Sequence, residues 1–188
     1  MCKRNDFWGL KNLTNLKVLI TIAFFSAISI ILGKFLALPV GQYMRFSFEN
    51  LPILLSGLLF GPFSGLLSGV IADLVGCVLR GYEINPILTV GAAVLGFTAG
   101  LVFQVLKKID NPLRVMLSVI IPHTLGSVLI KSYGLSLWYS LEFSVVLSYR
   151  TLNYIIVAIA EIIVITLMLK NKGFMSQIFR LTGDKNEL

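Results

Sequence analysis

The chain has 188 residues, of which 56% are hydrophobic and 13% are charged, and its mean hydropathy is +0.88. Soluble domains carry about 25% charged and 45–50% apolar residues. The composition therefore excludes a soluble domain and predicts one integral membrane domain over residues 1–188. The net charge of +7 comes from basic residues scattered at the ends of apolar runs. This distribution is typical of a membrane protein and argues against nucleic-acid binding.

Six apolar runs are long enough to predict transmembrane helices, which need about 20 mostly apolar residues. The predicted spans are 17–33, 48–63, 65–79, 86–106, 113–130 and 150–169, between a leader at 1–16 and a tail at 170–188. We interpret the first run as a retained span. It is long for a signal peptide and lacks the small-residue cleavage pattern.

Helix-breaking residues set the count of spans. Gly61-Pro62 separates the second span from the third; without this break the two would fuse and the bundle would have five helices. Pro86 suits the first turn of the fourth span, where its missing N–H costs nothing. We therefore predict an all-α bundle of six transmembrane helices.

Positive charge predicts the orientation, because Lys and Arg are enriched in cytoplasmic loops. With six spans, eleven Lys and Arg residues fall on the side that holds both termini, and five fall on the other side. The predicted bundle thus has a cytoplasmic leader and tail. Its three longer, more polar and aromatic loops face outward.

Motifs for catalysis, nucleotides and metals are absent from the sequence. It contains no G-x-x-x-x-G-K-[ST], G-x-S-x-G, H-E-x-x-H or C-x-x-C pattern. Cys2 and Cys77 offer no disulfide framework, and a single histidine, His123, excludes a His-rich metal site. We interpret His123, which follows Pro122, as a packing or kink residue. The sequence predicts no enzyme, no metal and no cofactor.

Three outward clusters of polar and aromatic residues are the candidates for ligand binding, because polar groups in a membrane are costly and commonly functional. Together their side chains suit a flat heteroaromatic ligand with charged substituents. The predicted substrate-binding residues are Tyr43, Arg45, Phe48, Glu49, Asn50, Arg80, Asn85, Trp138, Tyr149, Arg150 and Asn153.

Each cluster also has a structural alternative. Tyr43 and Arg45 could anchor the chain at the lipid headgroups. Asn85 precedes Pro86 and could cap the next helix. Arg150 and Asn153 share a helical face, although one charged residue at an interface is also explained by snorkelling.

A small-residue pattern on the first span, Ala23-x-x-x-Ala27, predicts close approach of another helix. That helix could belong to a partner protein or to the same bundle. The series Gly57, Gly61, Gly65 and Gly69 predicts close packing and a turn within the bundle.

Five stretches occur in a characteristic order. They are AFFSA at 23–27, RFSFENLPI at 45–53, GLLFGPFSGLLSGVIADLVG at 57–76, NPILTVGAAVLG at 85–96 and LSYRTLN at 147–153. Over residues 17–170 this set resembles the substrate-binding S components of energy-coupling factor (ECF) vitamin transporters, most closely the folate-specific branch.

The resemblance implies a division of labour. The chain would bind folate from outside, while a transmembrane coupling protein (EcfT type) and two cytoplasmic ATPases on other chains supply the energy. Ala23 and Ala27 would dock the coupling protein, and the whole component would tilt in the membrane lipid to release its cargo. It would work in the cell membrane without catalytic activity of its own.

Two departures from the folate branch fall in the predicted pocket, so they bear on the ligand rather than on the fold. The chain reads INPILT at 84–89 where that branch carries Phe-Pro-Gly-Phe-Thr, and Glu49 and Asn50 stand where glycine and phenylalanine are common. Another vitamin, such as pantothenate, riboflavin or thiamine, is the first alternative. An ion-coupled carrier using Asp73 or Glu161, and an intramembrane enzyme, are the others.

Overall fold

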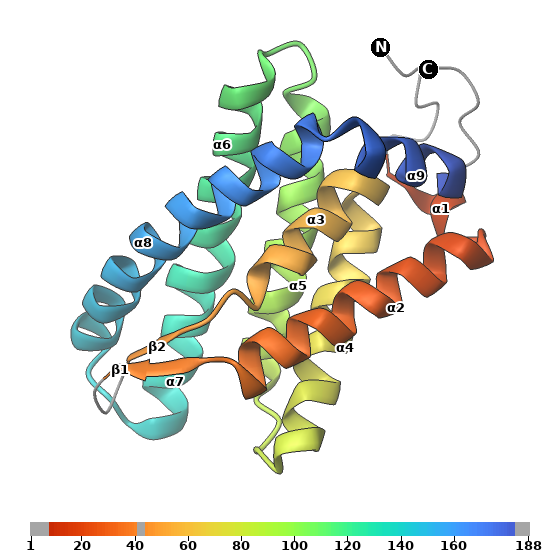
Figure 1. The fold of residues 1–188 in the computed structure, drawn as a ribbon. Helices are drawn as coiled ribbons and strands as arrows, with labels where there is room; N and C mark the ends of the chain where they lie inside the picture. The colour runs from red at the N-terminus through yellow and green to blue at the C-terminus, as the bar shows by residue number, and fades with distance from the viewer. Residues whose placement is uncertain (1–7, 41–43, 183–188) are drawn as a thin grey trace.

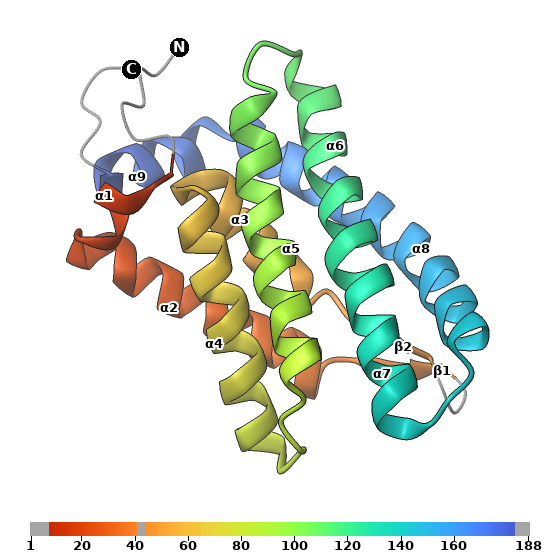
Figure 2. The same cartoon turned by 180° about the vertical axis from the view of Figure 1, so that it is seen from behind.

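The computed structural model describes residues 8–40 and 44–182, which form a bundle of helices with one short β-hairpin (Figure 1). Helices α1 and α9, nearest the two termini, lie together at one end of the bundle, and the hairpin lies at the opposite end (Figures 1 and 2). The fold is therefore all-helical as predicted, apart from the hairpin.

The N-terminal part leads from one end of the bundle to the other. The short helix α1 (Leu10–Leu13) precedes α2 (Leu16–Ile30), which continues as the π-helical η1 (Ile31–Phe35). Strands β1 (Leu38–Val40) and β2 (Met44–Phe46) then pair antiparallel. Asn15 caps α2, because its side chain accepts a hydrogen bond of 3.0 Å from the backbone N–H of Lys17.

Three helices form the centre of the bundle: α3 (Asn50–Phe60), α4 (Pro62–Arg80) and α5 (Pro86–Val105). The predicted break between α3 and α4 is confirmed, since Gly61 has φ +107°, a conformation that favours glycine. Helices α4 and α5 cross at Gly65 and Gly96. A Cβ atom on either residue would overlap the carbonyl of the other. Glycine therefore permits the close backbone approach that holds these membrane helices together.

The C-terminal half contains α6 (Asn111–Pro122), the π-helical η2 (His123–Ile130), α7 (Lys131–Tyr139), α8 (Phe143–Lys170) and α9 (Lys172–Thr182). The first three form one continuous run of 29 residues. The wider π-helical turns begin directly after Pro122. Proline lacks the N–H that an α-helical hydrogen bond needs at that position.

The sequence placed a loop between residues 130 and 150, but α7 and the first turns of α8 occupy most of it. Its mixed polarity reflects two environments of one helix. Lys131 and Ser132 are buried, whereas Trp138 and Tyr139 are exposed. The tail also contains a helix, α9. Its Ile178 is buried, and the carbonyl of Leu181 accepts a hydrogen bond of 3.0 Å from the Asn15 side chain.

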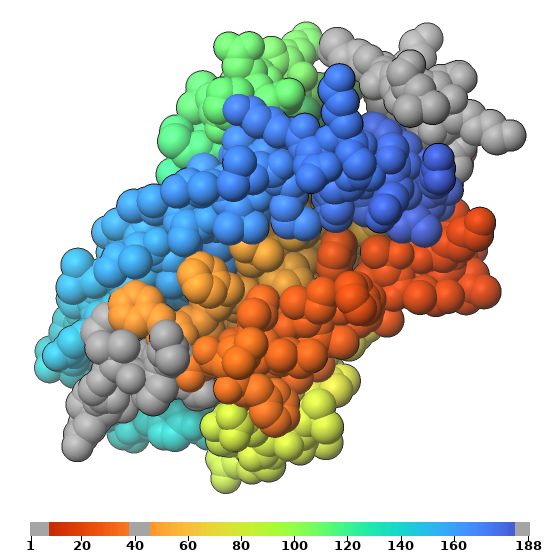
Figure 3. Space-filling model, viewed as in Figure 1, coloured from red at the N-terminus to blue at the C-terminus, as the bar shows by residue number. Residues whose placement is uncertain are grey.

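Five helical runs are long and apolar enough to cross a membrane: Leu16–Phe35, Pro62–Arg80, Pro86–Val105, Asn111–Tyr139 and Phe143–Lys170. Helix α3 has 11 residues, shorter than the other runs, and nearly all of them are buried. Large apolar side chains lie on the outside of the bundle, such as Phe24 of α2 and Leu167 of α8, which are 62% and 63% exposed. Helices α2 and α8 form much of the face seen in Figure 3. A surface of this kind is stable when lipid covers it.

Candidate functional site

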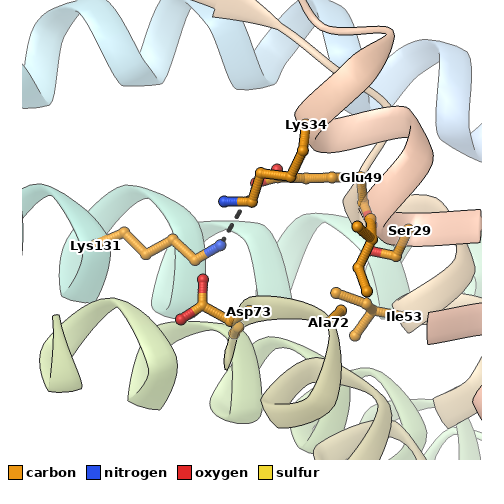
Figure 4. Close-up of a pocket in the computed structure, with 9 residues that line it drawn as sticks. Ser29, Lys34, Glu49, Ile53, Ala72, Asp73 and Lys131 are labelled. Carbon is orange, nitrogen blue, oxygen red and sulfur yellow. Dashed lines mark hydrogen bonds and ion pairs between the residues drawn. The ribbon is translucent and has the colours of Figure 1, made fainter. Parts of the chain in front are cut away.

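A pocket lies inside the bundle, between η1, α4, α5 and the start of α7 (Figure 4). It is lined by Ser29, Ile30, Lys34, Glu49, Ile53, Ala72, Asp73, Ala92 and Lys131. Its cavity volume of about 20 Å³ is far below the range of about 300–1,000 Å³ that is usual for ligand pockets, so the pocket is closed down around its charged side chains.

Four charged side chains meet in this pocket. The Nζ atom of Lys131 lies 3.7 Å from Oε1 of Glu49, and the hydroxyl of Thr89 donates a hydrogen bond of 2.7 Å to Oδ2 of Asp73. Figure 4 shows the Asp73 carboxylate and the ammonium groups of Lys34 and Lys131 directed into the same space. Charges removed from water need partners. The two ammonium and two carboxylate groups balance one another there.

Glu49 reaches the pocket because the start of α3 is held against the end of α2. The Ser29 hydroxyl on α2 donates a hydrogen bond of 2.6 Å to the backbone carbonyl of Glu49. Gly33 leaves space for the Glu49 side chain, since a Cβ atom on Gly33 would lie 2.7 Å from the Cβ of Glu49. The hairpin between them spans the distance from η1 to α3.

Two more glycines make room for the lysines. A Cβ atom on Gly76 of α4 would lie 2.9 Å from Cε of Lys34, and one on Gly91 of α5 would lie 2.6 Å from Cγ of Lys131. Each aliphatic stem thus crosses bare backbone, and each ammonium group is carried to the pocket. The glycines of these helices therefore shape the charged site as well as the packing.

The rest of the lining is aliphatic. It consists of Ile30, Ile53, Ala72 and Ala92, and none of the nine lining residues within the described chain is aromatic. The sequence led us to expect stacking by aromatic side chains, and this pocket does not provide it. The pocket therefore combines balanced charges with an aliphatic lining.

Beside the pocket, Asn50 and Arg150 meet at Ser127. The Asn50 side chain donates to the Ser127 hydroxyl at 3.5 Å, and Nε of Arg150 donates to the Ser127 carbonyl at 3.0 Å. Nη2 of Arg150 also donates to the Tyr154 hydroxyl at 3.1 Å. The structure thus gathers three predicted site residues, Glu49, Asn50 and Arg150, at and next to the pocket.

Two predicted residues have structural roles near the pocket. Arg80 donates to the carbonyl of Lys34, and its guanidinium lies 4.8 Å from the centre of the Phe35 ring. The Asn85 side chain accepts a hydrogen bond of 3.0 Å from the backbone N–H of Ile87, so the capping alternative accounts for it. Arg80 therefore supports the backbone that carries Lys34.

Four of the remaining predicted residues lie apart from the pocket lining. The Trp138 indole donates to Glu83 at 3.1 Å near the surface. Phe48 and Tyr149 are exposed, and Asn153 is half-buried. Arg45 belongs to β2, and Tyr43 lies outside the described residues.

Ala23 and Ala27 lie on the exposed face of α2, whereas Ile22 and Ser26 face the bundle and are buried. Internal packing therefore does not account for the small-residue pattern. The exposed strip is available to another helix.

Asp73 is a pocket residue that the sequence analysis names only for the alternative of an ion-coupled carrier. Its signal was an acidic side chain within an apolar run, which is costly unless it is paired. Lys34 and Lys131, which also line the pocket, are not among the substrate-binding residues predicted from the sequence. Their convergence depends on the crossing of η1, α4 and α7, which no local pattern predicts.

Comparison with protein families places residues 17–170 in the family described as "ECF transporter, substrate-specific component". A curated relative, an uncharacterized MG313 homolog of Mycoplasma pneumoniae, is 33% identical over 108 residues. The match covers 56% of this chain and 38% of the relative, so it spans well under half of that protein's length.

Three solved structures share the fold. FolT bound with folic acid has a TM-score of 0.65 at 24% identity, covering 80% of this chain and 89% of FolT. The S component for biotin from an ECF-type ABC transporter has a TM-score of 0.61 at 22% identity, covering 93% and 97%. The S component of a bacterial ECF transporter has a TM-score of 0.54 at 21% identity, covering 81% and 97%. The chain belongs to the family of substrate-specific components of ECF transporters, which are membrane-embedded, non-catalytic, substrate-binding subunits.

Proposed function

We propose that this chain is the folate-binding S component of an ECF vitamin importer. The observation that carries the proposal is the pocket in which Glu49 and Asp73 face Lys34 and Lys131. The 2-amino-4-oxo edge of a pterin ring presents adjacent N–H donors, which a carboxylate accepts well. The glutamate tail of folate carries carboxylates, which lysines attract. The shared fold with folate-bound FolT supports the same ligand.

Ligand entry requires the pocket to widen, since folate is far larger than its cavity volume of about 20 Å³. The Lys131–Glu49 contact of 3.7 Å is the natural place to open. A carboxylate of the ligand replaces Glu49 as the partner of Lys131. Charge stays balanced in the occupied pocket when the displaced Glu49 side chain leaves it.

Biotin is a second candidate. The aliphatic lining of Ile30, Ile53, Ala72 and Ala92 suits a ligand without an aromatic ring, and the S component for biotin has a similar fold. The lysines would then hold the single carboxylate of biotin, while the carboxylates accept from its ureido N–H groups.

The partners we propose are membrane lipid, a transmembrane coupling protein and two cytoplasmic ATPases. The sequence has no nucleotide-binding motif, so energy has to come from other chains. Ala23 and Ala27 form the docking strip, because small exposed residues allow a second helix to approach α2 closely.

The proposed membrane arrangement has six spans with both termini in the cytoplasm. Helix α3 is the sixth span and is sheltered by its neighbours, and α1 and α9 lie at one end of the bundle. A fluorescent protein fused to the C-terminus is expected to fluoresce, and alkaline phosphatase fused there to be inactive. Active phosphatase at that position would reverse the proposed orientation.

Purified wild-type protein is expected to bind folate with a Kd between nanomolar and micromolar, about −8 to −12 kcal/mol. Isothermal titration calorimetry in detergent measures this directly. Biotin, pantothenate, riboflavin and thiamine serve as competitors in the same experiment. If the protein binds one of these vitamins and does not bind folate, that vitamin is the ligand, and the family assignment is unaffected.

Substitutions in the pocket separate the two ends of the ligand. Asp73→Asn is expected to weaken folate binding by about 1.5–3 kcal/mol, because a hydrogen bond to a charged group is lost. It should weaken the binding of pteroate, which has no glutamate, to the same extent. Lys131→Met should weaken the binding of folate more than the binding of pteroate.

The matched controls for these substitutions are Asp110→Asn and Lys107→Met, which remove exposed charges in the connection between α5 and α6. Both are expected to bind folate like the wild type. Unchanged affinity of Asp73→Asn for both ligands would remove Asp73 from the site.

Ala23→Trp is expected to block co-purification with the coupling protein and to leave folate affinity within about twofold, since the bulky ring covers only the outer strip of α2. Ile159→Trp, at a position 57% exposed on α8, is the control and should assemble normally. Equal loss of assembly and ligand affinity in Ala23→Trp would show that the strip supports the bundle itself.

A further inference from the structure

A second buried pair of polar side chains lies away from the pocket. Nε2 of His123 is 2.5 Å from Oε2 of Glu161, and the two residues are 3% and 0% exposed. His123 follows Pro122 at the start of η2, and Glu161 lies in α8. Burying such groups costs several kcal/mol before pairing repays it. An apolar contact would serve stability as well, so the pair needs another explanation.

On the α8 side, the pair continues a polar stripe toward the pocket. Arg150, Tyr154 and Glu161 are spaced by four and seven residues, which places them on one face of the helix. The Tyr154 ring centre lies 5.0 Å from that of His123, and the Tyr154 hydroxyl accepts from Arg150 at 3.1 Å. The stripe therefore connects the buried pair to the cluster around Ser127.

The segment that faces α8 also carries polar residues at intervals of four, namely His123, Ser127 and Lys131. Each contacts a polar group of a neighbouring helix. His123 meets Glu161 at 2.5 Å, the Ser127 carbonyl accepts from Arg150 at 3.0 Å, and Lys131 lies 3.7 Å from Glu49. Segment 123–131 thus begins with His123 of the buried pair and ends with Lys131 of the pocket.

Rotation of this segment about its axis decides where Lys131 points. Residues 123–130 are π-helical, a conformation that is rare, marginal in isolation and frequent at functional sites. Gly126 packs against Gly91 of α5, where a Cβ atom would lie 2.6 Å from the Gly91 carbonyl. A glycine contact permits sliding and rotation, whereas a directional polar contact does not.

We infer that His123 and Glu161 are positioning residues of the ligand pocket, which act by fixing the rotation of segment 123–131 and thereby the place of Lys131. The inference rests on the proposed function, in which Lys131 holds a carboxylate of the ligand. Setting the register of packed helices is the best-attested role of buried polar contacts. Neither residue needs to touch the ligand.

The test replaces both members with apolar residues. His123→Leu combined with Glu161→Leu leaves neither side chain as an unpaired buried group, so we expect an unchanged or higher melting temperature. Folate affinity is expected to fall about tenfold, because Lys131 loses its position. The single substitution Glu161→Gln keeps an acceptor for His123, so this variant should bind folate with nearly wild-type affinity. Thr124→Leu, which alters an exposed residue of the same segment, is the control.

A double-mutant cycle with Lys131→Met distinguishes positioning from a general effect on the bundle. If the pair acts through Lys131, the double Leu variant should cause little further loss in the Lys131→Met background. Additive losses would mean that the pair acts elsewhere and would overturn the inference. Unchanged affinity of the folded double Leu variant would do the same.

A measurement without ligand covers the case in which the wild type does not bind folate, which would refute the proposed function alone. Spin labels at the exposed positions 129 and 24, with the native cysteines replaced, report the distance from the segment to α2. The distance distribution should broaden in the double Leu variant and remain narrow in the Thr124→Leu control. An equally narrow distribution in both would refute the positioning role. Should the double Leu variant not fold, His123→Phe with Glu161→Met fills the same space for these measurements.

Discussion

Charge inside a lipid-covered bundle has to be paired, and this requirement organises the site. Lys131 and Glu49 come from segments more than 80 positions apart and meet at 3.7 Å. They can do so only because the backbones of the intervening helices carry no side chains where the charged residues cross. Gly33 and Gly91 supply that space. A bulkier residue at either position would separate the partners and leave a charge unpaired in a medium of low dielectric constant.

The sequence predicts the fold well where a residue type has one dominant local meaning. Gly61-Pro62 breaks a helix in any context, and Asn85 before Pro86 caps one. The segment from Lys131 to Tyr149 was harder, because its polar and aromatic residues suit both an outer loop and a helix with two faces. Burial of Lys131 decides between these alternatives. That burial depends on α5 and α3, which are distant in sequence.

The site was predictable only in part for the same reason. Glu49 and Asn50 lie at the start of α3, and Arg150 opens the last predicted span, so these polar residues stand out in the sequence, and the structure brings them together. Asp73, His123 and Glu161 lie within apolar runs, and each is isolated in sequence. Asp73 is paired with Thr89 of α5, and His123 and Glu161 are paired with each other between η2 and α8. Pairing across helices depends on how the helices cross, and the periodicity of residues within one helix does not predict it.

The seam of glycines between α4 and α5 has an evolutionary consequence. At Gly65 and Gly96 the helices are joined backbone to backbone, so this contact depends on few side chains. The residues that would choose a ligand project from other positions of the same helices and from η1 and α7. Substitutions at those positions can change the bound ligand while the contact between α4 and α5 stays intact. Such a scaffold diversifies readily in specificity, and proteins with different vitamins can share it with little sequence in common.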